Sequence, residues 1–215
     1  MKLLKFTDRE TIDALKGGEV LSFPTETVFG LGVRYDDEKA FEKLVNVKRR
    51  PPEKPFTLMC ASANDVEKYA FVDEHIKAVI NKFMPGPITL LLKPKENLYP
   101  WVTLSSPTIG IRVPDFKKLQ DLIKDVGVPL LVPSANKSGE PPCKNIDEVI
   151  GAFDSEIYGA VDGKVNGALP STIVSLVDGE CKLIRQGDIS FDTIKMFIRR
   201  NYKDDYCNGM WPRWF

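Results

Sequence analysis

The chain has 215 residues, of which 43% are hydrophobic, so it can form a proper core and is not a disordered chain. This length fits one large domain or two small ones. Lysine plus arginine equals aspartate plus glutamate at 30 each, so no overall positive field attracts a polyanion and any basic site has to be local.

Several classes of site are excluded by what the sequence lacks. The four cysteines are scattered without a CxxC pair and the only histidine is His75, so we expect no metal site of the protein's own and reduced cysteines. A P-loop motif is absent. No stretch approaches the roughly 20 apolar residues of a membrane span, and the N-terminus lacks the apolar core of a secretory signal. We therefore expect a cytoplasmic protein with no membrane partner.

Hydrophobic periodicity predicts helices and strands that are mixed along the whole chain. In chain order we expect a helix over 10–17, a strand over 19–23, a helix over 38–48, a strand over 55–62, helices over 64–71 and 73–83, strands over 88–93 and 108–114, a helix over 115–127, a strand over 128–133, a helix over 146–153, a strand pair over 171–177 and 181–187, and a helix over 190–200. Without a linker or a repeat, this order favours one α/β or α+β domain.

Five segments at predicted strand ends carry hydrogen-bond donors. They are FPTET, which leads into a Gly-Leu-Gly segment, the basic loop KRRPPEK, the segment TIGIR, the turn PSANKSG and Arg185 in LIRQG. Each segment alone is typical of a turn, a strand end or a solvated loop. Hydroxyl and cationic donors of this kind bind anions, and together they indicate an anionic ligand.

The same segments, in the same order, carry a family resemblance. FPTETVFGLG, KRRPPEKP, MPGPITLLLKP, TIGIRVP, VPSANKSGEPPC and STIV followed by LIRQG resemble the YrdC-like family of threonylcarbamoyl-AMP synthases. The resemblance runs from about Phe6 to Arg185. It implies an α/β fold with a single twisted mixed sheet, flanking helices and a basic concave face. We assign residues 1–200 to this catalytic domain and leave residues 201–215 as a C-terminal tail of open role.

The resemblance also implies an activity. Members make threonylcarbamoyl-AMP from ATP, L-threonine and bicarbonate or CO2, and Mg²⁺ accompanies the ATP. The product supplies the tRNA threonylcarbamoyl transferase machinery that forms t6A at position 37 of tRNA. Whether tRNA binds this chain directly stays open.

Site residues follow from the resemblance position by position. It assigns a catalytic contribution to Lys48 and Arg50. It assigns ATP binding to Arg50, Lys54, Thr108, Ser134, Asn136 and Arg185, and threonine binding to Thr27, Arg112, Val132 and Ser171. The chain departs from some members at Met59, where they carry a histidine.

Two other functions remain as alternatives. A non-catalytic RNA-binding module could use the same basic concavity, and its affinity would fall steeply with salt. A carbamoyl-adenylate-forming enzyme of the hydrogenase-maturation type has a similar domain, but those proteins are long and carry zinc fingers that this chain lacks.

Overall fold

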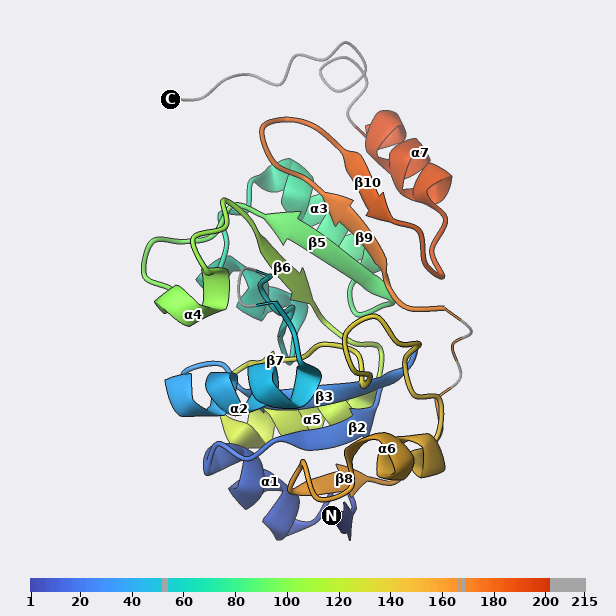
Figure 1. The fold of residues 1–215 in the computed structure, drawn as a ribbon. Helices are drawn as coiled ribbons and strands as arrows, with labels where there is room; N and C mark the ends of the chain where they lie inside the picture. The colour runs from blue at the N-terminus through green and yellow to red at the C-terminus, as the bar shows by residue number, and fades with distance from the viewer. Residues whose placement is uncertain (52–53, 166, 168, 202–215) are drawn as a thin grey trace.

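The computed structural model describes residues 1–51, 54–165, 167 and 169–201 (Figure 1). Its elements in chain order are β1 (Lys2–Leu4), α1 (Arg9–Lys16), β2 (Leu21–Pro24), β3 (Phe29–Arg34), α2 (Glu38–Lys48), β4 (Leu58–Met59), the 3₁₀ helix η1 (Ala63–Lys68), α3 (Glu74–Phe83), β5 (Ile88–Leu92), α4 (Pro100–Thr103), β6 (Ile109–Arg112), α5 (Lys117–Val126), β7 (Leu130–Leu131), α6 (Ile146–Phe153), β8 (Gly159–Val161), β9 (Thr172–Ser175), β10 (Lys182–Arg185) and α7 (Phe191–Asn201).

The described strands form one mixed sheet in the order β1-β8-β2-β3-β7-β4-β6-β5-β9-β10. Strand pairs β1/β8, β2/β8, β4/β6 and β5/β9 are parallel, and the other neighbours are antiparallel. The predicted single-domain α/β fold with a mixed sheet and flanking helices is therefore confirmed. The central strands β7 and β4 have only two residues each.

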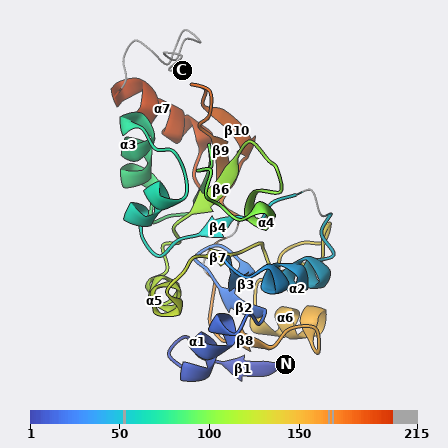
Figure 2. The same ribbon diagram turned by 90° about the vertical axis from the view of Figure 1, so that its left-hand side faces the viewer.

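Helices cover both faces of the sheet. In the half that carries the N-terminus, α1 and α5 lie on one side and α2 and α6 on the other (Figure 2). The first pair encloses a small core that includes Leu15, Phe23 and Leu122. A larger core extends under α2 and α6 and continues beneath α3 and α7, which meet through Phe83 and Phe197 at 5.4 Å between ring centroids.

Short polar side chains cap the N-termini of three helices. The side chains of Asp37, Asp73 and Asn145 accept hydrogen bonds from the first-turn amides of α2, α3 and α6. Helix α2 ends at Lys48, and the next residue, Arg49, caps it in the left-handed conformation with φ of 51°. This turn directs the following Arg50 away from the helix axis and toward the middle of the sheet.

Four elements were missed and one helix was wrong in type. The segment predicted as a helix over 64–71 is the 3₁₀ helix η1, and before its first turn the Ser62 amide and hydroxyl donate to Asp65 Oδ2 at 3.1 and 2.7 Å. Strands β1, β3 and β8 and the one-turn helix α4 were not predicted. Strand β3 was hidden by its glycines, which stand there because a Cβ at Gly32 would come within 2.5 Å of the Phe23 ring.

Two further expectations bear on the whole chain. In the described ranges, no helix is long and apolar enough to cross a membrane. Cys60, Cys143 and Cys181 are free thiols, as expected. The predicted tail 201–215 lies outside the described residues apart from Asn201, which ends α7.

Two glycines offer a matched test of this packing. A Cβ at Gly187 would lie 2.1 Å from the Pro170 carbonyl oxygen and 2.5 Å from the Ser171 carbonyl carbon. The G187A substitution therefore forces the backbone at residue 187 away from the backbone of Pro170 and Ser171. We expect it to lower the free energy of unfolding by about 1–3 kcal/mol or more. Gly151 in α6 has no atom within 4 Å of such a Cβ, so G151A should raise stability by about 0.5–1 kcal/mol. Urea denaturation of both variants measures these changes, and equal stabilities would contradict the packing at Gly187.

Candidate functional site

A cavity of about 150 Å³ opens at the middle of the sheet, where β3, β6 and β9 and the loop after β7 meet. Seven of the predicted site residues line it. They are Thr27, Arg50, Arg112, Val132, Ser134, Ser171 and Arg185. These residues span 159 positions of sequence from Thr27 to Arg185, so the fold brings together segments that the sequence motifs only ordered.

The loop after β2 presents hydroxyls to the cavity because it folds on its own side chains. The Thr25 hydroxyl donates to the Val28 carbonyl at 2.7 Å and lies 3.0 Å from the Thr27 hydroxyl. The Thr27 hydroxyl in turn accepts from Arg112 Nη2 at 3.0 Å. Arg112 ends β6, so the strand and the loop hold one another at the cavity wall.

Lys48 and Asn136 stand behind the wall and do not line the cavity. The Lys48 ammonium is buried and donates to the Ser134 carbonyl at 2.7 Å and to Asn136 Oδ1. Asn136 Nδ2 donates to the carbonyls of Lys137 and Glu140 at 2.8 and 2.7 Å, which closes the loop on itself. In this geometry Lys48 and Asn136 position Ser134, and the predicted catalytic contribution of Lys48 stays a prediction.

Arg50 reaches the cavity with its orientation fixed. Its Nε and Nη2 atoms donate to the carbonyls of Lys54 and Pro55 at 2.9 and 3.0 Å, and its guanidinium lies 5.1 Å from the centre of the Phe56 ring. Two backbone bonds and one aromatic face therefore hold the planar group. Arg49, one position earlier, is exposed.

Arg185 and Ser171 form the opposite wall. Arg185 Nη2 donates to the Ser171 carbonyl at 2.8 Å and to its hydroxyl at 3.2 Å. The Ser171 hydroxyl also lies 2.9 Å from the buried hydroxyl of Thr89. Thr89 was not predicted, although a threonine inside the otherwise apolar run ITLLL was a signal for it.

Lys54 and Thr108 were predicted ATP ligands that do not line the cavity. Lys54 is exposed, and its carbonyl oxygen accepts from Arg50. Thr108 is half-buried just before β6, with its amide donating to the Ser106 hydroxyl at 3.2 Å. Met59, which stands where some relatives carry histidine, does line the cavity.

Positive charge dominates this small space. Burial lowers the pKa of the Arg50 guanidinium, and burial together with the charge of Arg112 lowers the pKa of Arg185. Both groups remain protonated because arginine titrates far above neutral pH. Three arginines and several hydroxyls at one cavity are arranged to bind an anion, which would relieve their mutual repulsion.

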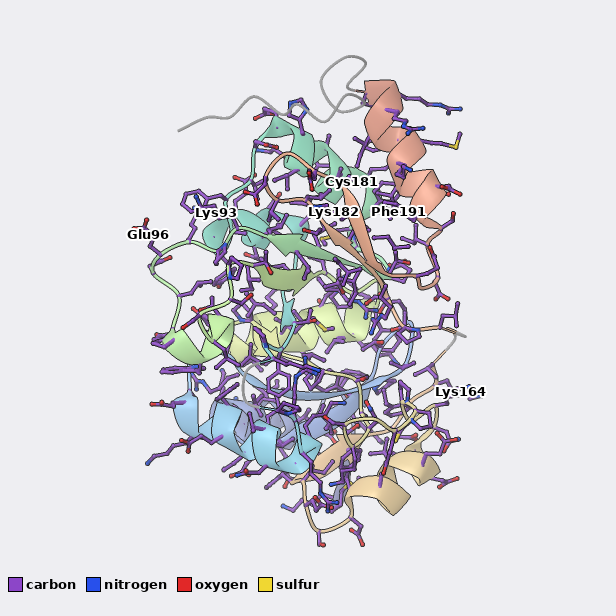
Figure 3. The ribbon with its side chains drawn as sticks, turned by 45° about the horizontal axis from the view of Figure 1, so that its top comes forward. Lys93, Glu96, Lys164, Cys181, Lys182 and Phe191 are labelled. Carbon is purple, nitrogen blue, oxygen red and sulfur yellow. The ribbon has the colours of Figure 1, made fainter. Side chains whose placement is uncertain are left out.

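A second cavity, of about 250 Å³, lies between the β9–β10 connection and α7. It is lined by Cys181, Lys182, Lys195 and Ile198, among others, and Figure 3 labels Cys181 and Lys182 beside β10 and Phe191 at the start of α7. None of the predicted site residues lines it. Among the described residues there is no cluster of three or more histidine, cysteine, aspartate or glutamate side chains able to hold a metal ion.

Comparisons with known proteins identify the family of the chain. The family model Sua5_yciO_yrdC, described as "Telomere recombination", matches residues 13–187. The threonylcarbamoyl-AMP synthase of Yersinia enterocolitica is 35% identical over 185 residues, covering 83% of this chain and 94% of the relative. That of Bacillus subtilis is 36% identical over 187 residues, covering 86% of this chain and 54% of the relative.

A solved structure, P. abyssi Sua5 complexed with L-threonine, superimposes with a TM-score of 0.84 at 29% identity. The match covers 91% of this chain and 60% of that one. The chain therefore spans a little over half the length of the Bacillus and Pyrococcus proteins.

The burial of Lys48 predicts a pH dependence of stability. Burial, with the charge of Arg50, lowers the pKa of Lys48 to about 8, against ~10.4 for an exposed lysine. Between these values the unfolded chain binds more protons at this site than the folded one. The contribution of Lys48 to stability is therefore lowest below pH 8 and rises as the pH increases toward ~10.4.

We expect the free energy of unfolding of the native protein to rise, relative to that of K48M, by on the order of 1–3 kcal/mol between pH 7 and pH 10. Denaturant titrations at pH 7, 8, 9 and 10 measure it. The control is K39M, which removes an exposed lysine from the same helix and should leave the difference constant. A constant difference for K48M as well would show that this ammonium is not desolvated.

Proposed function

We propose that this chain, which belongs to the Sua5–YciO–YrdC family, is a nucleotidyltransferase that makes threonylcarbamoyl-AMP from L-threonine, bicarbonate or CO2, and ATP. The observation that carries the proposal is the cavity itself, in which three arginines from separate segments face a set of hydroxyls. We also infer that the product serves t6A formation at position 37 of tRNA in the cytoplasm, through a downstream threonylcarbamoyl transferase.

The chemistry has two steps. The neutral threonine amine adds to the carbon of CO2 and releases a proton, or reacts with bicarbonate and releases water, to give a carbamate. A carbamate oxygen then attacks the α-phosphorus of ATP, the bond to the β-phosphate bridge oxygen breaks, and pyrophosphate leaves. The carbamate is already an anion, so the second step needs positioned positive charge more than a strong base.

Different walls of the cavity suit the two substrates, threonine and ATP. Arg112 and Thr27 form one wall, where a guanidinium and a hydroxyl suit the carboxylate and hydroxyl of threonine. Arg50 and Arg185 come from other segments and carry planar forks that match phosphate oxygens. Ser134 and Ser171 complete the cavity with short hydroxyls.

Mg²⁺ enters this proposal as part of the substrate MgATP. The ion prefers octahedral oxygen ligands and usually keeps several waters while bound to substrate phosphates. The cavity offers hydroxyl oxygens and arginines, which fit a metal that is carried by the triphosphate. When bound, Mg²⁺ would neutralise charge on the phosphates.

The non-catalytic RNA-binding module is the weaker candidate. A site for an RNA backbone needs exposed cations along a groove, whereas Arg112 is 7% exposed and hydrogen-bonded inside the cavity. A buried guanidinium such as that of Arg112 suits a small ligand that enters the cavity.

Omission of substrates tests the proposed reaction. Pyrophosphate release from MgATP should require both threonine and bicarbonate, because the attacking carbamate contains both. A coupled pyrophosphate assay with each component left out in turn measures it. Equal release without threonine would refute the proposed function.

Arg50 and Arg49 provide a matched pair of variants. R50K keeps the charge but loses the planar fork that two carbonyls hold in place, so kcat/KM for ATP should fall by roughly 10–100-fold, about 1.4–2.8 kcal/mol. R49K makes the same change at an exposed residue and should cost less than about 2-fold.

Steady-state kinetics with ATP varied, beside a thermal melt for each variant, separate a lost contact from a lost fold. Equal kinetics of the two variants would mean that the phosphate contact lies elsewhere.

A further inference from the structure

One carboxylate stands at the wall of the cavity, and the motif assignments gave it no role. Glu26 Oε1 lies 2.7 Å from Arg112 Nη2, and the two side chains are 15% and 8% exposed. The Asp115 amide donates to the same oxygen at 3.1 Å. Glu26 therefore lies directly behind the wall that Arg112 and Thr27 form, and does not itself line the cavity.

The three lining arginines differ in their partners. Arg50 donates to the carbonyls of Lys54 and Pro55, and Arg185 donates to Ser171. Neither has a carboxylate within ion-pair distance in the described part of the chain, and only Arg112 does. One wall of the cavity is therefore close to neutral, while the other carries two uncompensated positive charges.

The pair is also incompletely hydrogen-bonded. Arg112 Nε and Glu26 Oε2 are buried and lack a hydrogen-bond partner among the described residues. Buried polar atoms of this kind are costly unless a ligand or a water completes them. The Glu26–Arg112 pair thus balances charge without using all of its hydrogen-bonding atoms.

Charge balance has a direct consequence for what can bind beside Arg112. A guanidinium without a counter-ion would attract phosphate as strongly as carboxylate, and in this cavity phosphate is supplied by the other substrate and by the product. A carboxylate beside the guanidinium repels a polyanion far more than it repels a zwitterion, which has no net charge. The ion pair thus favours an amino acid over pyrophosphate at this wall.

We propose that Glu26 is a positioning and specificity-determining residue, which orients Arg112 and cancels its charge so that this wall accepts zwitterionic threonine and excludes phosphate groups. The inference rests on the proposed function. It predicts that threonine and pyrophosphate bind to the native protein side by side, without competition.

The test is calorimetric binding of pyrophosphate, with and without saturating threonine, to the native protein and to E26Q. The glutamine keeps the shape and an oxygen acceptor but removes the charge. We expect pyrophosphate to bind E26Q at least about 10-fold more tightly and threonine to compete with it there. Unchanged pyrophosphate affinity in a folded E26Q would overturn the proposal.

Two further variants separate charge from structure. The double variant E26Q/R112Q removes both charges, so pyrophosphate affinity should return to within about 3-fold of the native value; affinity that stays as tight as in E26Q would count against charge cancellation. D36N breaks the Arg34–Asp36 pair, which has the same 2.7 Å contact away from the cavity, and should bind pyrophosphate as the native protein does. A tighter D36N would show a non-specific charge effect and overturn the proposal.

If E26Q fails to fold, E26D withdraws the carboxylate by one methylene and should tighten pyrophosphate binding in the same direction by a smaller factor. No change in E26D would then overturn the proposal. Binding requires no turnover, so the result is independent of the proposed reaction. Loss of threonine-dependent pyrophosphate release in the native protein would refute the function, and only the binding data would refute the role of Glu26.

Discussion

The buried ammonium of Lys48 is the contact on which the site depends. It ties the last turn of α2 to the loop after β7 through the Ser134 carbonyl and the Asn136 side chain. These partners are 86 and 88 positions away in sequence, so the contact joins two distant segments from outside the cavity. Once this bond is formed, Arg50, two residues on, and Ser134 both face the same space. A buried cation is costly, and its hydrogen bonds offset only part of that cost, because burial still lowers the pKa of Lys48 to about 8.

Positive charge at the cavity is the second constraint. Arg50, Arg112 and Arg185 line a space of about 150 Å³, and the charge of Arg112 acts on Arg185. The fold tolerates this because each guanidinium is held by oxygen atoms of the protein. Backbone carbonyls hold Arg50 and Arg185, and only Arg112 has a full negative charge beside it. Because only Arg112 is paired with a carboxylate, positive charge is lower beside Arg112 than beside Arg50 and Arg185. This uneven charge suits one polyanionic and one zwitterionic substrate.

Long, strongly periodic elements were predicted correctly from sequence, because burial of one face decides their type. Helix α5 is an example, whereas strand β5 was predicted from its nearly continuous apolar run, which is buried on both faces. The missed elements are short or glycine-containing. Strand β3 contains Gly30 and Gly32, which local propensity assigns to loops, yet both are required where Val132 and Phe23 approach the strand. The 3₁₀ helix η1 was misassigned because its apolar spacing does not distinguish the two helix types.

The sequence by itself determined the family, the order of the donor-bearing segments and seven of the residues that line the cavity, since these depend on residue type and spacing. Tertiary structure alone decided which donors reach the cavity and which support it. It placed Lys48 and Asn136 behind the wall, added Thr89 beside Ser171 and paired Glu26 with Arg112. Each of these contacts joins residues more than 80 positions apart. Such pairings are set by the packing of the whole sheet, and no local pattern of residues encodes them.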